Sequence, residues 1–79
     1  MSENKVTTTL DVKGLNCPLP ILKTKKAINE IKIGENIEVL ATDPGSVNDF
    51  QAWIESTGHE LVESTEENGI FRYLIKKTK

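Results

Sequence analysis

Cys17 is the residue of this sequence best suited to chemistry, and it is the only cysteine. It stands in the segment Gly14-Leu-Asn-Cys-Pro-Leu-Pro20. A proline after Cys17 disfavours helical backbone at the cysteine, and Pro18 and Pro20 both suit the first turn of a helix. We therefore expect Cys17 at the N-cap, or just before it, of a helix that follows a strand. The free N–H groups and positive potential of a helix N-terminus stabilise a thiolate.

The reactivity of such a thiol depends on its ionisation. At the ordinary pKa of about 8.5 only ~3% is thiolate at pH 7, whereas a pKa one to two units lower gives roughly a quarter to three quarters. Lys23, Lys25 and Lys26 follow within two turns and add positive charge. A free cysteine is also among the residue types most often buried as a small hydrophobe. The residues alone therefore leave open both a functional thiol and a structural Cys17.

The elements that must position Cys17 follow from the hydrophobic pattern. An alternating, β-branched segment over residues 7–12 predicts a first strand. Gly14 is expected to allow a turn with positive φ, and Asp11 to orient the loop through backbone N–H groups. Apolar residues spaced by three and four between Ile21 and Ile31 predict the first helix, which Gly34 ends.

The second half of the sequence predicts another strand and helix, followed by a hairpin. A strand is expected over 36–42, followed by an Asp43-Pro44-Gly45 turn. Ser46 and Asp49 are expected to form a capping box at the start of a second helix. A helical repeat at intervals of three and four is formed by Val47, Phe50, Ile54 and Thr57, and Gly58 ends the helix. Segments 60–65 and 70–77 predict strands of a hairpin, because Asn68-Gly69 is a strong turn signal.

These elements predict an α/β fold, in detail an α+β two-layer sandwich of order βαβαββ. Each strand–helix–strand unit predicts parallel neighbouring strands, and the final hairpin is antiparallel, so the four-stranded sheet is mixed. Each helix has a single apolar stripe, and we therefore expect both helices on one face of the sheet. A chain of 79 residues is expected to form a single domain over 1–79, with residues 1–5 disordered.

Composition narrows the function classes. A net charge of −2 argues against direct nucleic-acid binding, which requires concentrated positive charge. One cysteine and one histidine cannot form a structural zinc site, and we expect no metal and no cofactor. The sequence has neither an apolar run long enough to span a membrane nor a secretory leader, and an unpaired cysteine suits a reducing compartment. We expect a cytoplasmic monomer.

The segment around Cys17 also resembles a known signature. Its pattern Asp-x-x-Gly-x-x-Cys-Pro-x-Pro, from Asp11 to Pro20, is similar to that of the TusA/SirA family of small sulfur-carrier proteins. The resemblance extends from about Thr8 to Lys77 and includes Asp43-Pro44. It implies the same βαβαββ fold. It also implies a persulfide relay, with a donor such as a cysteine desulfurase or rhodanese-like protein and an acceptor protein.

The resemblance assigns roles to particular residues. It makes Cys17 the catalytic residue, in a relay that works with partner enzymes rather than as a stand-alone catalyst. The remaining residues fall into two groups: Asp11, Gly14, Pro18 and Pro20 would shape the loop, and Lys23, Lys25, Lys26 and Asp43 would face partner proteins.

Leu19 departs from the family pattern, because members that act in tRNA thiolation carry an acidic residue between the prolines. The pathway therefore stays open among tRNA thiolation, molybdenum cofactor, selenium and oxidative sulfur metabolism. Without a second cysteine a two-cysteine redox mechanism is excluded, which counts against a thiol peroxidase or disulfide oxidoreductase. The main alternative is a non-catalytic interaction or regulatory module with a structural Cys17. His59 is interpreted as a surface residue, with a role beside the thiol as its alternative, and Phe50 and Trp53 as core or rim packing.

Overall fold

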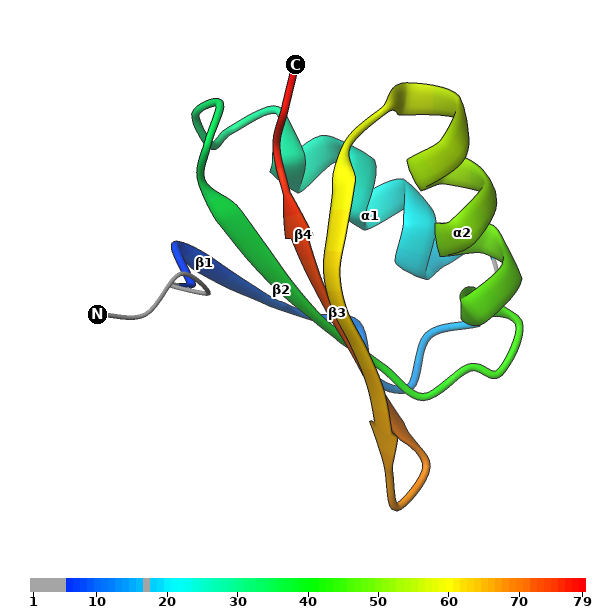
Figure 1. Cartoon of the computed structure of the whole chain (residues 1–79). Helices are drawn as coiled ribbons and strands as arrows, with labels where there is room; N and C mark the ends of the chain where they lie inside the picture. The colour runs from blue at the N-terminus through cyan, green and yellow to red at the C-terminus, as the bar shows by residue number, and fades with distance from the viewer. Residues whose placement is uncertain (1–5, 17) are drawn as a thin grey trace.

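The computed structural model describes residues 6–16 and 18–79. It has six elements: β1 (Thr8–Asp11), α1 (Leu19–Ile28), β2 (Asn36–Ala41), α2 (Ser46–Thr57), β3 (Glu60–Glu67) and β4 (Ile70–Lys76). The strands form one mixed sheet and both helices pack on the same face of it (Figure 1). The predicted α/β two-layer sandwich of order βαβαββ is confirmed. Residues 1–5 and Cys17 lie outside the described residues, so the expected disorder of 1–5 stays a prediction.

The strand order is β1-β2-β4-β3, which corrects the sequence prediction in one respect. β1 and β2 are parallel neighbours as expected, but β4 lies between β2 and β3 and pairs antiparallel with both. The prediction of parallel neighbours was therefore wrong for the second strand–helix–strand unit. The reason is burial: β4 carries the fully buried segment Tyr73–Ile75, whereas β3 contains four glutamates and no apolar residue that is fully buried. A charged strand suits the edge of a sheet.

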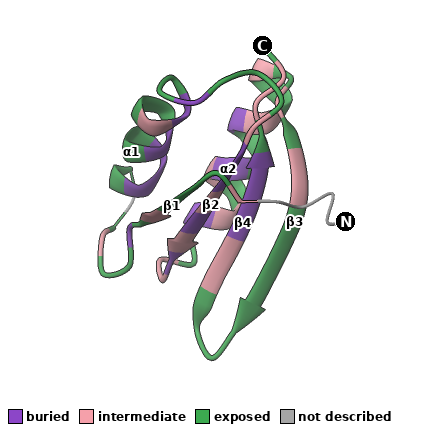
Figure 2. Cartoon of the chain, turned by 90° about the vertical axis from the view of Figure 1, so that its left-hand side faces the viewer, coloured by how far each residue is buried: buried purple, intermediate pink, exposed green. Residues whose placement is uncertain are grey.

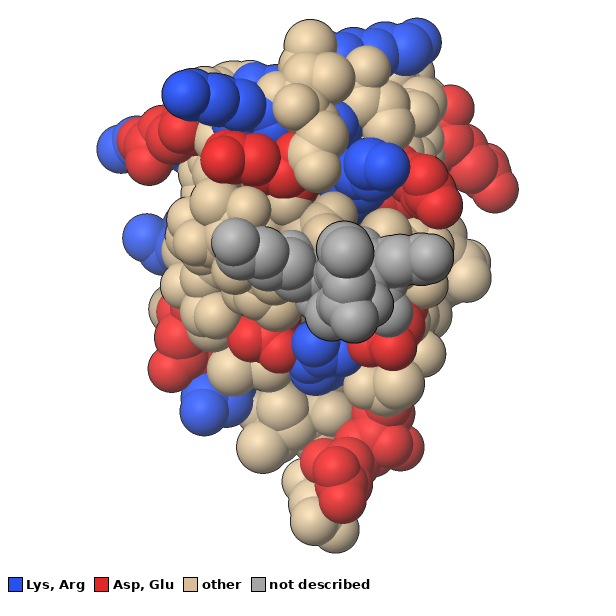
Figure 3. Space-filling model, turned by 60° about the vertical axis from the view of Figure 1, so that its left-hand side comes forward, with Lys and Arg blue, Asp and Glu red and all other residues tan. Residues whose placement is uncertain are grey.

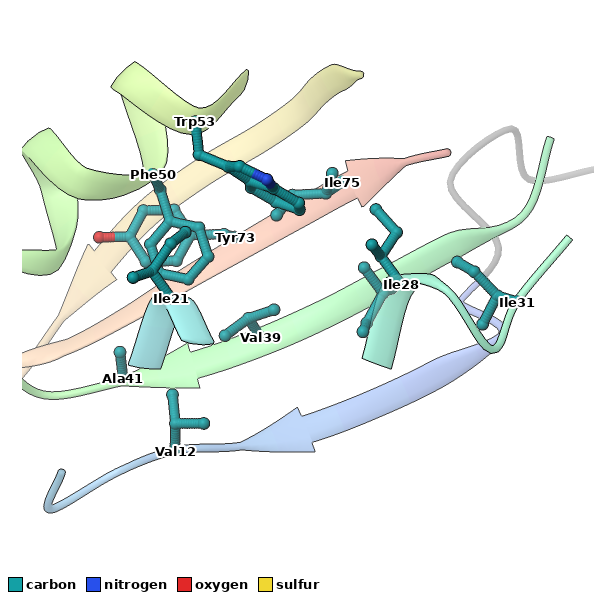
Figure 4. Packing of buried hydrophobic residues seen from close by; sticks show 11 residues of the cluster. Val12, Ile21, Ile28, Ile31, Val39, Ala41, Phe50, Trp53, Tyr73 and Ile75 are labelled. Atoms are coloured by element: carbon teal, nitrogen blue, oxygen red, sulfur yellow. The ribbon is translucent and has the colours of Figure 1, made fainter. Parts of the chain in front are cut away.

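The core lies between the sheet and the helices (Figure 4). Val39 of β2 and Tyr73 of β4 are direct partners across the sheet and both are buried. The ring of Phe50 stacks on that of Tyr73 with 4.5 Å between centroids, and Trp53 meets Phe50 edge-on at 6.3 Å. The interpretation of Phe50 and Trp53 as packing residues is confirmed. Figure 2 shows the same division by burial, with β2 mostly buried, β4 buried over Tyr73–Ile75, and β3 mostly exposed.

The first helix is shorter than predicted. It ends at Ile28, and the next residues form tight turns in which the Ile31 N–H donates to the Ile28 carbonyl at 3.4 Å. Ile31 is nevertheless buried against the core. The apolar spacing was read as helix because Ile31 continues the buried face, although the chain has already left the helix. Gly34 follows with a φ of 95°.

The capping box at the start of α2 was wrong, although the helix does begin at Ser46. The N-cap residue is Gly45, and no side chain caps the helix. The Ser46 hydroxyl instead lies 2.8 Å from the Tyr73 hydroxyl in a buried hydrogen bond. Ser46 therefore faces the core, where its polar atom satisfies Tyr73, and this choice of partner could not be read from local spacing.

The face of the sheet opposite the helices carries a line of polar contacts. The Thr9 hydroxyl donates to Glu38 at 2.9 Å, Arg72 donates to the same carboxylate through Nε, and its Nη1 lies 2.6 Å from Glu63. These residues lie on β1, β2, β4 and β3, so the line crosses all four strands. The hydrogen bond from Arg72 lowers the pKa of Glu38. The predicted turn at Asn68-Gly69 is confirmed, because both residues have positive φ.

Candidate functional site

The loop that leads to Cys17 leaves β1 along the edge of β2. The Val12 N–H donates to the Leu40 carbonyl at 2.8 Å, and the Leu15 N–H donates to the Val12 carbonyl at 3.2 Å, which closes a turn. Gly14 lies within this turn with a φ of 83°. That conformation is strained for residues with a Cβ, so the sequence places glycine where the turn requires it.

Two side chains hold backbone N–H groups of this loop. Asp11 Oδ1 accepts the Lys13 N–H at 3.0 Å, and Thr42 Oγ1 accepts the Gly14 N–H at 2.9 Å. The contact of Asp11 is local, over two residues. The contact of Thr42 spans 28 residues of sequence and joins the loop before Cys17 to the end of β2. Sequence reasoning missed Thr42, because nothing in its neighbourhood indicates which distant N–H it would accept.

Helix α1 begins directly after the cysteine position. Its N-cap residue is Pro18, the Leu19 N–H donates to the Asn16 carbonyl at 2.8 Å, and the Leu22 N–H donates to the Pro18 carbonyl at 3.1 Å. Pro20 lies buried in the first turn. Cys17 itself lies outside the described residues. Its place in the sequence is the residue before the N-cap, and Asn16 and Pro18 on either side are exposed.

The loop lies at the carboxyl ends of the parallel strands β1 and β2, where the β2–α2 connection also lies (Figure 1). Asp43 belongs to that connection, and the Gly14–Thr42 hydrogen bond brings the two loops side by side. The Asp43 carbonyl accepts the Ser46 N–H at 3.0 Å, and its Oδ1 accepts the Gly45 N–H at 3.3 Å. Open α/β sheets commonly place their binding sites at this end of the strands.

A groove of about 410 Å³ lies between the two helices, and Pro18 is one of its lining residues. Its lining residues are Pro18, Ile21 and Lys25 on the α1 side and Asp49, Ala52, Trp53 and Ser56 on the α2 side. Ile21 and Trp53 are each only 8% exposed and give the groove an apolar base. Lys25 and Asp49 place opposite charges on its two sides. The groove therefore offers an apolar contact next to the residue that follows Cys17.

The three predicted lysines do not share one surface. Lys25 lines the groove toward α2, whereas Lys23 and Lys26 line a second cleft of about 300 Å³ beside Leu10 of β1. Positions 23 and 26 are three residues apart and lie on the same side of a helix, and position 25 points elsewhere. Figure 3 shows basic and acidic side chains interspersed over the face that it displays, rather than one basic patch.

His59 lies at the other end of the sheet. It precedes Glu60, which pairs with Lys76 beside the first residue of β2, whereas Thr42 follows the last residue of β2. Its Nδ1 accepts the Thr78 N–H at 3.2 Å, and its ring lies 5.6 Å from that of Trp53. Burial lowers the pKa of His59, and Lys77 and Lys79 lower it further. His59 therefore lies at the opposite end of β2 from the Gly14–Thr42 contact, and its role beside the thiol stays an untested alternative because Cys17 lies outside the described residues.

Within residues 6–16 and 18–79 no group of three or more His, Cys, Asp or Glu side chains is arranged to hold a metal ion. Neither α1 nor α2 has the length and apolar character needed to cross a lipid bilayer.

Comparison with known proteins agrees with the geometry. Residues 8–77 match the family described as Sulfurtransferase TusA. The sulfur carrier protein TusA of Allochromatium vinosum is 58% identical over 69 residues, which cover 87% of this chain and 91% of that protein. The putative sulfur carrier protein YrkI of Bacillus subtilis is 51% identical over 77 residues, 98% of this chain and 99% of that one.

A solved structure shows the same fold. The crystal structure of a SirA-like protein from Desulfitobacterium hafniense superposes with a TM-score of 0.79 at 27% identity, covering 92% of this chain and all of that one. The family match spans β1 to β4 and includes the segment from Asp11 to Pro20. The chain therefore belongs to the TusA family of sulfurtransferases.

Proposed function

We propose that this sulfur carrier holds sulfane sulfur as a persulfide on Cys17 and passes it from a donor protein to an acceptor protein. The observation that carries the proposal is the place of the only cysteine in the sequence, directly before Pro18, which is the N-cap of α1 and lines an open groove. Family membership supports the relay of sulfur. The position before the helix supports Cys17 as the residue that does it.

The chemistry needs no external oxidant. The Cys17 thiolate attacks the terminal sulfur of a persulfide on the donor, a new S–S bond forms, and the donor cysteine leaves as a thiolate. In the second step a thiolate of the acceptor attacks the terminal sulfur on Cys17, and the Cys17 thiolate is released. One zero-valent sulfur atom moves in each step, so the oxidation states balance. The absence of a second cysteine prevents the chain from discharging its own persulfide as a disulfide.

Helix α1 supports the thiolate electrostatically. It has ten residues, carries no acidic side chain in its first turn, and has Lys25 and Lys26 in its last turn. Acidic residues in the first turn would otherwise neutralise the positive end of the helix dipole. The positive potential at Pro18 therefore stays available to stabilise a thiolate at the preceding residue of the sequence.

Partners would dock around the start of α1. Leu19 and Leu22 are large apolar residues that are 44% and 51% exposed, and the groove lies on the adjacent side of the helix. We propose that a donor such as a cysteine desulfurase covers this apolar surface, with Lys25 and Asp43 among the contacts. Lys23 and Lys26 would contact a partner from the β1 side. A carrier with a free thiol suits a reducing compartment, so we propose that the protein acts in the cytoplasm. We also propose that the carrier is a monomer.

The central test is direct loading. The protein is incubated with a cysteine desulfurase and L-cysteine, and its intact mass is measured before and after treatment with dithiothreitol. We expect the wild type to gain one sulfur atom that dithiothreitol removes, and Cys17→Ser to gain none. A wild type that gains no sulfur, or a Cys17→Ser variant that gains as much, refutes the proposal and favours a non-catalytic module.

A second test addresses the groove. Ala52 and Gln51 are neighbouring exposed residues of α2, but only Ala52 lines the groove. Ala52→Phe should obstruct it and slow loading by a desulfurase about tenfold or more, as expected for a central interface position. Gln51→Phe is the matched control and should load normally. Both variants should load at the wild-type rate from inorganic polysulfide, which needs no docking surface; slow polysulfide loading would contradict a docking role.

A further inference from the structure

The Gly14–Thr42 hydrogen bond acts on the loop that leads to Cys17. Gly14 is three residues before the cysteine, and its N–H donates to Thr42 Oγ1 at 2.9 Å. With a φ of 83°, Gly14 occupies the left-handed region. Glycine populates positive and negative φ about equally, so glycine alone does not select this conformation. The positive φ belongs to the turn closed by the Leu15 N–H and the Val12 carbonyl, and the acceptor on Thr42 holds the Lys13–Gly14 peptide within that turn.

The backbone around Thr42 is held in place by contacts of its neighbours. It follows Ala41, which is fully buried at the end of β2, and Thr42 is half-buried. The next residue, Asp43, accepts the Ser46 N–H through its carbonyl and so ties the connection to α2. The Val12 N–H donates to the Leu40 carbonyl, which keeps the segment after β1 alongside β2 up to this point. The Thr42 hydroxyl is therefore a fixed acceptor against which the Gly14 turn is set.

We propose that Thr42 is a positioning residue for Cys17, acting through Gly14. Its hydroxyl fixes the orientation of the Lys13–Gly14 peptide and thereby holds the turn from which the chain continues to Leu15 and Asn16. The role rests on the proposed function of Cys17 as the reacting residue. Losing the acceptor should let the Lys13–Gly14 peptide and its turn move, so that the segment before Cys17 is held less firmly at the end of β2 and the thiol reacts more slowly.

The test compares Thr42→Val, which keeps the shape but loses the acceptor, with Thr42→Ser, which keeps a hydroxyl. The rate of Cys17 alkylation by iodoacetamide is measured across pH, together with loading from a desulfurase. We expect Thr42→Val to raise the apparent thiol pKa and to slow alkylation at pH 7 about fivefold, the equivalent of one hydrogen bond of ~1 kcal/mol. Thr42→Ser should stay within about twofold of the wild type.

Thr9 offers a matched control. Its hydroxyl also makes a 2.9 Å hydrogen bond, to Glu38 on the open face of the sheet. Thr9→Val should leave the alkylation profile unchanged. If Thr42→Val alkylates like the wild type, or if Thr9→Val changes the profile equally, the positioning role is wrong. If Thr42→Val does not fold, Thr42→Ala takes its place and is judged by the same profile.

The two proposals fail separately. The alkylation profile reports on the thiol whether or not sulfur is carried. A wild type that accepts no sulfur but whose thiol responds to Thr42→Val would refute the proposed function and retain the positioning role. A wild type that loads normally and a Thr42→Val variant that also does, with an unchanged profile, would refute the positioning role alone.

Discussion

Replacing Ser46 with alanine should destabilise the fold through Tyr73. Both side chains are 1% exposed, and their hydroxyls lie 2.8 Å apart. Without Ser46 the Tyr73 hydroxyl is left buried with no partner among the described contacts, which costs about 1–3 kcal/mol. For a chain of this size, about 2 kcal/mol corresponds to a fall in Tm of roughly 8–16 °C. Thermal and urea unfolding would measure the change.

A double-mutant cycle separates this explanation from the helix cap that the sequence suggested. If Ser46 acts on Tyr73, Tyr73→Phe in the Ser46→Ala background should add little further loss, because no unsatisfied hydroxyl remains. If Ser46 stabilised the helix start, the two losses would add. Ser64→Ala is the control, because Ser64 pairs with Tyr73 across the sheet yet is exposed, and it should change stability by less than about 0.5 kcal/mol. Additive losses would refute the reasoning.

Three further changes test other contacts. Burial lowers the pKa of His59 in the folded protein, and Lys77 and Lys79 lower it further. The unfolded chain therefore binds the proton first as the pH falls. The free energy of unfolding should be highest above pH 6.5 and should decrease as the pH drops through the lower folded pKa. Urea unfolding of His59→Gln should lose that part of the pH dependence. The hydrogen bond from Arg72 lowers the pKa of Glu38, so Arg72→Met should cost about 1 kcal/mol at pH 7, and the difference from the wild type should shrink as Glu38 becomes protonated at acid pH. Gly14→Ala should cost about 1–2 kcal/mol by urea unfolding from backbone strain alone, because a Cβ there meets no atom within 4 Å, and Gly14→Asn should cost less.

Local signals in the sequence predicted the elements well. The alternation before Gly14, the Asn68-Gly69 turn and the helical spacing around Phe50 each depend on neighbours within a few residues. Predictions failed where distant partners decide the outcome. Ser46 has the spacing of a cap but hydrogen-bonds Tyr73, 27 residues away. β4 lies inside the sheet because it is the more buried strand. The rule that makes β2 and β3 parallel neighbours takes no account of burial, so it did not predict this strand order.

The candidate site also has one part that local sequence predicts and another that only the packed fold creates. The cysteine, its prolines and Gly14 form a contiguous segment that the sequence shows directly. The groove does not, because Ile21 and Trp53 meet only after both helices have packed on the sheet. The three lysines looked equivalent in sequence, yet the turn of the helix directs Lys25 to one cleft and Lys23 to another. The resemblance assigned Asp43 to the partner-facing residues, and the hydrogen bond of its neighbour Thr42 shows that its loop adjoins the loop before the cysteine.

The central place of β4 bears on how the chain folds as it is synthesised. β4 is the last of the six elements in sequence, yet it joins β2 to β3. Until it leaves the ribosome, the nascent chain has one short parallel pair and a glutamate-rich strand with no neighbour to bond. Most of the sheet must therefore form in one late, cooperative step. A nascent chain halted before Tyr73 would lack the buried strand β4, so we expect the cysteine segment to be held by a folded sheet only after β4 has been synthesised.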